Sequence, residues 1–96
     1  MEIKIDRNTK IKIEVEATTE EATLSKVVLY NDDWHTFDEV ITQLIKATRC
    51  TFEEARNFAF EVHVKGRATV FFGELTKCFK VSTILQEIAL HTEVVS

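Results

Sequence analysis

Hydrophobic and polar residues alternate in one way near the start of the chain and in another way beyond it. In residues 1–23, isoleucines alternate with charged residues, first at Ile3 and Ile5 and again from Ile11 onward. A period of two is typical of an extended segment with one apolar face. We therefore predict an N-terminal extension, as an extended arm or an edge hairpin, over residues 1–23, and a core domain over residues 24–96.

The rest of the chain shows strand-like and helix-like blocks. Thr36-x-x-Glu39 and a second Thr-x-x-Glu motif from Thr51 are capping boxes, and each precedes an apolar stripe at helical spacing. Gly66 can take the positive φ that ends a helix. The predicted elements are a strand over 24–30, helices from Thr36 and from Thr51, a strand over 67–72, a helix over 74–90 and an extended end at 93–95. This order predicts an α+β domain with three helices packed on one face of a small antiparallel sheet.

Composition narrows the classes of function. The 96 residues carry a net charge of −4, and Lys and Arg are scattered rather than clustered, so binding to nucleic acid is not expected. No apolar run is long enough to span a membrane, and the start does not resemble a signal peptide. Cys50 and Cys78 form no CxxC pair, which fits a reducing, cytoplasmic setting.

The candidate chemistry lies between the first strand and the first helix, at Asn31-Asp32-Asp33. A turn accounts for an Asn-Asp pair, but two adjacent carboxylates repel each other, and a cation would relieve that repulsion. A metal site would join Asp32, Asp33, His35 and His63, whose spacing matches no zinc pattern. A catalytic reading would pair Asp32 with His63 and lacks a nucleophile motif. We therefore predict no catalytic residue, no metal and no cofactor.

Apolar residues flank this acidic loop. Phe37 and Val40 lie within two turns of it, and Val62 precedes His63 at the end of the second helix. Each of these residues is a core residue by default. A groove between the first two helices would nevertheless have an apolar interior and an acid-rich rim. Such a site suits a ligand with a cationic head and a bulky apolar body.

Two sequence runs carry a family resemblance. The run NDDWHTFDEV, followed by a second helix that ends in EVHVKG, resembles ClpS, the adaptor of Clp-type AAA+ proteases. The resemblance covers Lys26 to about Val95 and implies a ClpS-like fold, similar to the ribosomal stalk C-terminal domain. It implies a binding module rather than an enzyme. ClpS-like adaptors of the N-end rule bind N-degrons, substrates that begin with Leu, Phe, Tyr or Trp, and deliver them to the N-terminal domain of a ClpA- or ClpC-type unfoldase for proteolysis.

The resemblance also implies residue roles, position by position. Asn31, Asp32 and His63 would bind the substrate's α-amino group. The hydrophobic pocket would be lined or gated by Tyr30, His35, Phe37, Val40, Ala59 and Val62, with Val95 at its far wall. Lys80 on the third helix would be the candidate for docking the unfoldase. The chain departs from the family pattern at His35 and Phe37, where Thr or Asn and Met are usual, and at Ala59, where a larger side chain is usual.

Two alternatives remain open at this point. The first is a structural protein–protein interaction domain of the same fold, which would have no use for Asn31, Asp32 and His63 as a group. The second is a small hydrolase or metalloprotein that uses Asp33 and a histidine. The three hypotheses differ in whether an amine-binding hollow exists beside the acidic loop.

Overall fold

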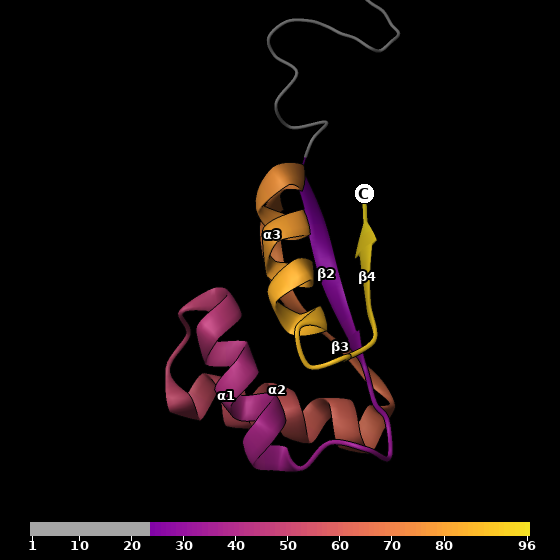
Figure 1. Ribbon diagram of the computed structural model, residues 1–96. Helices are drawn as coiled ribbons and strands as arrows, with labels where there is room; N and C mark the ends of the chain where they lie inside the picture. The colour runs from indigo at the N-terminus through magenta and orange to yellow at the C-terminus, as the bar shows by residue number, and fades with distance from the viewer. Residues whose placement is uncertain (1–23) are drawn as a thin grey trace, which may run out of the picture.

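The structure, a computed structural model, describes residues 24–96 (Figure 1). The arm predicted for residues 1–23 lies outside the described residues. The elements are β2 (Leu24–Tyr30), α1 (Phe37–Thr48), α2 (Phe52–Lys65), β3 (Arg67–Glu74), α3 (Leu75–Gln86) and β4 (Thr92–Val95). The predicted order of strands and helices is confirmed.

The three strands form one antiparallel sheet in the order β3-β2-β4, so β2 is the central strand. Residues of β2 alternate between two faces, and Val27 and Leu29 are completely buried on the face that meets the helices. A bulge between Val27 and Val28 shifts the register with β3. The predicted α+β class, with the helices on an antiparallel sheet, is confirmed.

The helices are arranged so that α3 lies along the sheet while α1 and α2 lie at one end of it (Figure 1). The core has contributions from every element. The buried apolar residues are Val27, Val28, Leu29, Ile41, Leu44, Ala55, Ala59, Val62, Ala68, Val70, Cys78, Val81, Leu85 and Leu90. The first two helices therefore reach the sheet at the end where β2 leads into the Asn31-Asp32-Asp33 loop.

Both expected capping boxes are present. The Thr36 hydroxyl accepts from the Glu39 backbone N–H at 3.1 Å, and the Glu39 carboxylate accepts from the Thr36 N–H at 2.8 Å. Thr51 and Glu54 repeat the arrangement at the start of α2. Gly66 ends α2 at φ 90°, as expected of a glycine C-cap.

The third helix is shorter than expected. The prediction extended it to Leu90, but α3 ends at Gln86, and a turn with Ala89 at φ 66° follows. The turn frees Leu90 from the helix and leaves it buried. The strand β3 is two residues longer than expected, because Gly73 and Glu74 continue to pair with Ser25 and Leu24.

No helix within residues 24–96 has the length and apolar character needed to cross a membrane.

Candidate functional site

The acidic loop is held against the end of α2. Tyr30, the last residue of β2, pairs with Arg67 of β3, and the Asn31 N–H donates to the Gly66 carbonyl at 2.9 Å. Since Gly66 caps the helix on which His63 lies, this bond brings Asn31 to the end of α2 that carries His63. The register of one strand pair thus joins two segments that are about thirty residues apart in the sequence.

The carboxylate of Asp32 organises the loop. Its Oδ1 accepts from the backbone N–H groups of Trp34 (2.9 Å) and His35 (3.0 Å), and its Oδ2 lies 2.8 Å from the His35 Nδ1. Burial alone would raise the pKa of Asp32, but these hydrogen bonds together outweigh burial and hold the pKa below its ordinary value. Asp32 therefore remains ionised at neutral pH and keeps a negative charge at the site.

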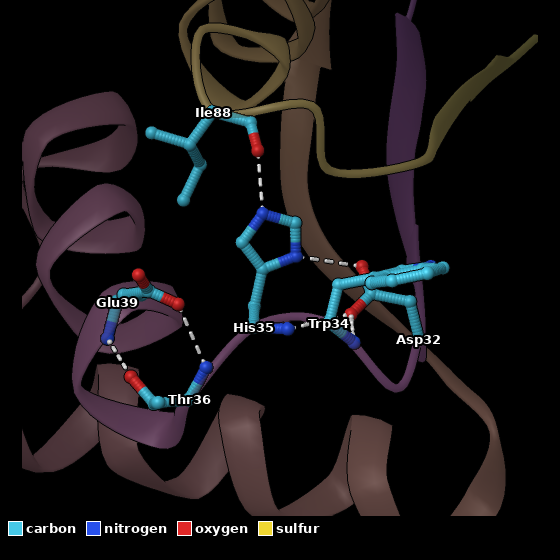
Figure 2. A network of polar contacts seen from close by, with 6 residues as sticks. All are labelled: Asp32, Trp34, His35, Thr36, Glu39 and Ile88. Carbon is cyan, nitrogen blue, oxygen red and sulfur yellow. Dashed lines mark hydrogen bonds and ion pairs between the residues drawn. The ribbon is translucent and has the colours of Figure 1, made fainter.

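The imidazole of His35 connects the loop to the end of α3. One ring nitrogen faces Asp32, and the other, Nε2, lies 2.5 Å from the Ile88 carbonyl oxygen (Figure 2). The side chains of His35 and Asp32 are 12% and 17% exposed, so both groups are largely shielded from water. This contact fixes the position of the turn that leads to Leu90.

A cavity of about 300 Å³ opens beside this loop. Its polar lining comes from the loop and from the end of α2, and its apolar lining comes from α1, α2, the end of β2 and the turn after α3. The lining residues are Leu29, Tyr30, Asn31, Asp32, Asp33, His35, Phe37, Val40, Ala59, Val62, His63 and Leu90. The cavity therefore has the amphiphilic character that the sequence predicts for a groove between the first two helices.

The aromatic rings at the cavity are held by specific contacts. Phe37 meets His63 edge to face, with ring centroids 5.4 Å apart and an interplanar angle of 86°. The Tyr30 hydroxyl donates to the Glu93 Oε1 at 2.6 Å, and this hydrogen bond raises the pKa of Tyr30. The Tyr30 ring also packs against His91 at a centroid distance of 4.9 Å. These contacts limit the rotation of two side chains that line the hollow.

The structure brings together most of the residues that the resemblance singled out. Asn31, Asp32 and His63 line the same cavity, together with all six residues expected to line or gate the pocket. Lys80 lies exposed on α3.

Val95 does not line this cavity, contrary to expectation. It pairs with Lys26 on β4, whereas Thr92 pairs with Leu29 near the loop. Because β4 runs antiparallel to β2, each residue further along β4 lies further from the cavity. The wall is instead closed by Leu90, which precedes β4.

Three lining residues were absent from the expected pocket: Leu29, Asp33 and Leu90. Asp33 follows Asp32 directly, and its position in the acidic pair was a sufficient signal to include it. The strand pattern places Leu29 on the apolar face of β2 but does not show that it borders a cavity. Leu90 carried no local signal, because the helical pattern of α3 continued through it.

Within residues 24–96, no group of three or more His, Cys, Asp or Glu side chains is arranged to hold a metal ion. Cys50 and Cys78 are both free thiols.

Comparisons with known proteins agree with this geometry. The family described as "ATP-dependent Clp protease adaptor protein ClpS" matches residues 20–93. The ClpS adapter protein of Treponema denticola is 39% identical over 62 residues, which cover 60% of this chain and 61% of that protein. The structure of Agrobacterium tumefaciens ClpS2 bound to L-phenylalaninamide superposes with a TM-score of 0.68 at 22% identity, covering 75% of this chain and 96% of the other. At this identity the likeness shows the fold.

Large ubiquitin ligases also contain similar segments. The E3 ubiquitin-protein ligase UBR2 of Mus musculus is 40% identical over 58 residues, and UBR1 of Drosophila melanogaster is 36% identical over 70 residues. These matches cover 60% and 72% of this chain but only 3% and 4% of the ligases. Because the ClpS family pattern extends over most of the sequence, from the residues before β2 into β4, the chain belongs to the ClpS family of Clp protease adaptors.

Proposed function

We propose that the protein is an adaptor that binds the free N-terminus of substrate proteins whose first residue is bulky and apolar, and that it delivers them to a Clp AAA+ unfoldase. One observation carries the proposal. A single cavity combines carbonyl, carboxylate and imidazole acceptors from the loop and the end of α2 with apolar side chains from the surrounding elements. An N-terminal residue such as Leu or Phe presents a cationic amine and an apolar side chain on the same carbon atom.

The polar end of the cavity suits an ammonium group. Asn31 offers an amide oxygen, Asp32 and Asp33 offer carboxylates, and the His63 ring offers a nitrogen acceptor. Hydrogen bonds between an ammonium and a carboxylate are stronger than neutral ones. Acetylation of the substrate's amine removes its charge and most of its donors. We therefore expect acetylated peptides to bind at least ~10-fold more weakly.

The apolar end supplies selectivity for the side chain. Burial of a Leu or Phe side chain contributes roughly 1.5–3 kcal/mol of transfer free energy, or about one to two orders of magnitude in affinity. A glutamate at the first position would lose the hydration of its charge and would lie close to Asp32 and Asp33. The cavity should therefore favour Leu, Phe, Tyr and Trp over Glu.

Fluorescence anisotropy of labelled peptides tests this binding. Peptides that begin with Leu, Phe, Tyr or Trp should bind, while the same peptides acetylated, or with Glu at the first position, should bind at least ~10-fold more weakly. The alternative of a structural interaction domain predicts no such discrimination. Equal affinity for all of these peptides would overturn the proposal.

Side-chain substitution gives a sharper test of the amine-binding role. Asp32→Ala should remove most of the affinity, but Asp32 also makes three hydrogen bonds within the loop. Asn31→Ala is the cleaner variant, because the Asn31 contact with Gly66 uses the backbone N–H and survives the substitution. It should weaken binding ~10-fold. Asn57→Ala, on the exposed surface of α2, is the matched control and should bind as the wild type does.

Delivery is a separate step with its own test. Lys80 is exposed on α3, where a cation can pair with an acidic partner surface. Lys80→Ala should weaken binding to the isolated N-terminal domain of a ClpA- or ClpC-type unfoldase while peptide affinity stays unchanged. Lys65→Ala is the control, since Lys65 lies 3.9 Å from Glu61 in an exposed pair on α2. Equal losses for both variants would exclude a specific role for Lys80.

The ubiquitin ligase relatives favour a second candidate for the step after recognition. Their identities to this chain, 40% and 36%, are similar to the 39% of the Treponema ClpS adapter, although the similar segment is a small part of each ligase. The same recognition domain could therefore act as a substrate-binding module of a ubiquitin ligase. Peptide binding is common to both candidates, and binding to the unfoldase N-terminal domain distinguishes them.

A further inference from the structure

The ring of His35 lies between two groups that can only accept hydrogen bonds. The Nδ1 atom is 2.8 Å from the Asp32 Oδ2, and the Nε2 atom is 2.5 Å from the Ile88 carbonyl oxygen. A neutral imidazole has one N–H, so it could donate to one of these partners while its lone pair faced the other. Both contacts are satisfied together only by the imidazolium, which donates from both nitrogens.

The surroundings favour that charged form. Burial alone would lower the pKa of His35, but the hydrogen bonds to Asp32 and Ile88, with the negative charges of Asp32 and Glu39, outweigh it and raise the pKa above its ordinary value. The Glu39 carboxylate accepts from the Thr36 N–H at the start of α1 (Figure 2).

Other ionisable groups approach this part of the molecule from each neighbouring element. Those that line the cavity with His35 are Tyr30 at the end of β2, Asp33 in the loop and His63 at the end of α2. Glu87, next to Ile88 in the turn after α3, is paired with Lys46 of α1 at 2.8 Å. His91 packs against the Tyr30 ring. The cationic partner of Asp32 among the described residues is therefore His35, which lies in direct contact with it.

A cation near the C-terminal end of α3 is electrostatically favourable. The last turn of α3 contains no basic residue. Carbonyl groups at a helix C-terminus carry partial negative charge and favour a cation nearby. His35 can supply this cation from the loop before α1, 53 positions before Ile88 in the sequence. The Ile88 carbonyl that it meets lies two residues before Leu90, which closes the cavity wall.

We propose that His35, as a cation bridging Asp32 and Ile88, is a positioning residue of the recognition site, which fixes the Asp32 carboxylate at the amine end and holds the Leu90 turn at the apolar end. The link to recognition rests on the proposed function, whereas the bridge itself does not. His35 thus acts through Asp32 and Leu90 and ties the two ends of the cavity together.

The pH dependence has a definite sign. The pKa of His35 is raised on folding, so the bridge is complete below the ordinary histidine pKa of about 6.5, and it is lost as pH rises through the raised value. The pKa of Asp32 is lowered, so its contribution is complete above the ordinary aspartate value and is lost as pH falls through the lowered one. The bridge therefore operates between the two shifted values.

Nitrogen-15 NMR of the histidine rings tests the bridge in the free protein. The chain has three histidines, so His63 and His91 provide two reference signals in the same sample. We expect both His35 nitrogens to show imidazolium shifts above the ordinary histidine pKa, and the midpoint to move down in Asp32→Asn. A His35 midpoint at or below about 6.5, or one that Asp32→Asn leaves in place, would overturn the bridge.

Peptide binding then tests the positioning role. His35→Asn keeps a donor near Asp32 but is too short to reach Ile88, and His35→Gln extends a donor toward Ile88 instead. Below the His35 midpoint, each variant should bind a Leu-initiated peptide ~10-fold more weakly than wild type, because one charge-assisted contact is lost. Above the midpoint the ratio should approach one, because wild type then loses the bridge as well.

Titration of the peptide amine affects both proteins equally and cancels in that ratio. A ratio that stays constant with pH would reduce His35 to a packing residue and overturn its positioning role. If wild type binds none of the peptides, the proposed function fails, and the NMR titration still decides whether the bridge exists. If either variant fails to fold, the other variant and the wild-type titration together decide the proposal.

Discussion

The first two helices and the third helix are built in different ways. Both α1 and α2 begin with a complete capping box, carry acidic residues in the first turn and end in a left-handed residue, Arg49 or Gly66. Helix α3 begins at Glu74 without a side-chain cap, has no acidic residue in its first turn and no basic residue in its last. The first pair is specified by nearby sequence, whereas α3 depends on what packs against it.

Neighbouring elements supply what α3 lacks at its C-terminal end. The Gln43 amide of α1 donates to the Ile84 carbonyl at 2.6 Å, and the His35 ring contacts the Ile88 carbonyl. Lys46 pairs with Glu87 at 2.8 Å. Local turn hydrogen bonds to the Ile84 and Gln86 carbonyls are thus supplemented at this end by side chains that are distant in sequence.

This difference extends to the cavity. Its polar lining comes from the loop before α1 and the end of α2, beside the locally specified capping box of α1 and glycine cap of α2. Its wall at Leu90 comes from the turn after α3. Packing and long-range hydrogen bonds hold that turn in place. We therefore expect core substitutions in α3 to affect the Leu90 wall as well as stability, and cap substitutions in α1 or α2 to have smaller effects.

The largest effect is expected from Leu85→Ala. Leu85 is fully buried in the last turn of α3, and its truncation to alanine should cost ~2–5 kcal/mol of unfolding free energy. Thr83→Ala, exposed on the same helix, is the matched control and should change stability by less than about 0.5 kcal/mol. Urea denaturation followed by far-ultraviolet circular dichroism measures both. Similar losses for the two variants would contradict the role given to packing.

A substitution at the end of α2 should have the next largest effect. Gly66 has φ 90°, and an added Cβ would meet no atom within 4 Å, so Gly66→Ala adds backbone strain without a clash. The expected cost is ~1–2 kcal/mol. The contrasting variant is Arg49→Gly at the end of α1, where φ is 62°. This substitution should raise the free energy of unfolding by about 0.5 kcal/mol. Thermal unfolding of both proteins tests whether these helix ends are locally encoded.

The start of α2 provides a smaller test. Thr51→Ala removes the side chain that accepts from the Glu54 N–H at 3.0 Å, and it should cost ~1 kcal/mol. Thr76→Ala, in the first turn of α3, removes a threonine of equal size from a helix start that has no side-chain cap. That control should stay within about 0.5 kcal/mol of wild type. A larger loss at Thr76 than at Thr51 would reverse the comparison between the helices.

The same contrast explains how much could be predicted from the sequence. The starts of α1 and α2 and the glycine end of α2 were predicted correctly because Thr36, Thr51 and Gly66 act within one helical turn of themselves. The end of α3 was predicted four residues too late. Its apolar pattern continues to Leu90, and the turn at Ala89 places a non-glycine residue at positive φ, which no local motif indicates.

The residues of the candidate site also divide into those that the sequence predicts and those whose positions depend on tertiary structure. The Asn31-Asp32-Asp33 loop and His63 could be grouped from the residues and from the family resemblance, and the structure lines one cavity with them. Val95 was misplaced because its position depends on the register of β4 with β2. Leu90 was missed because the turn at Ala89 takes it out of a helical pattern that continues through it in the sequence. The contact between His35 and Ile88 spans 53 positions, so no sequence spacing could suggest it.

The smallest predicted effect comes from a substitution that would add the missing N-terminal side-chain cap to α3. Glu74 precedes the helix at φ −59° and ψ 150°, in the extended region where capping residues lie, but its side chain makes no capping hydrogen bond. Glu74→Asp keeps the negative charge and shortens the side chain by one methylene, so that the carboxylate can accept from the first free N–H groups of α3. We expect a gain of about 0.5 kcal/mol, measured by thermal unfolding. Glu74→Gln keeps the length without the charge and should give no gain. If Asp and Gln behaved alike, the start of α3 would be governed by its packing on the sheet, and local capping could not be added to a helix that depends on its neighbours.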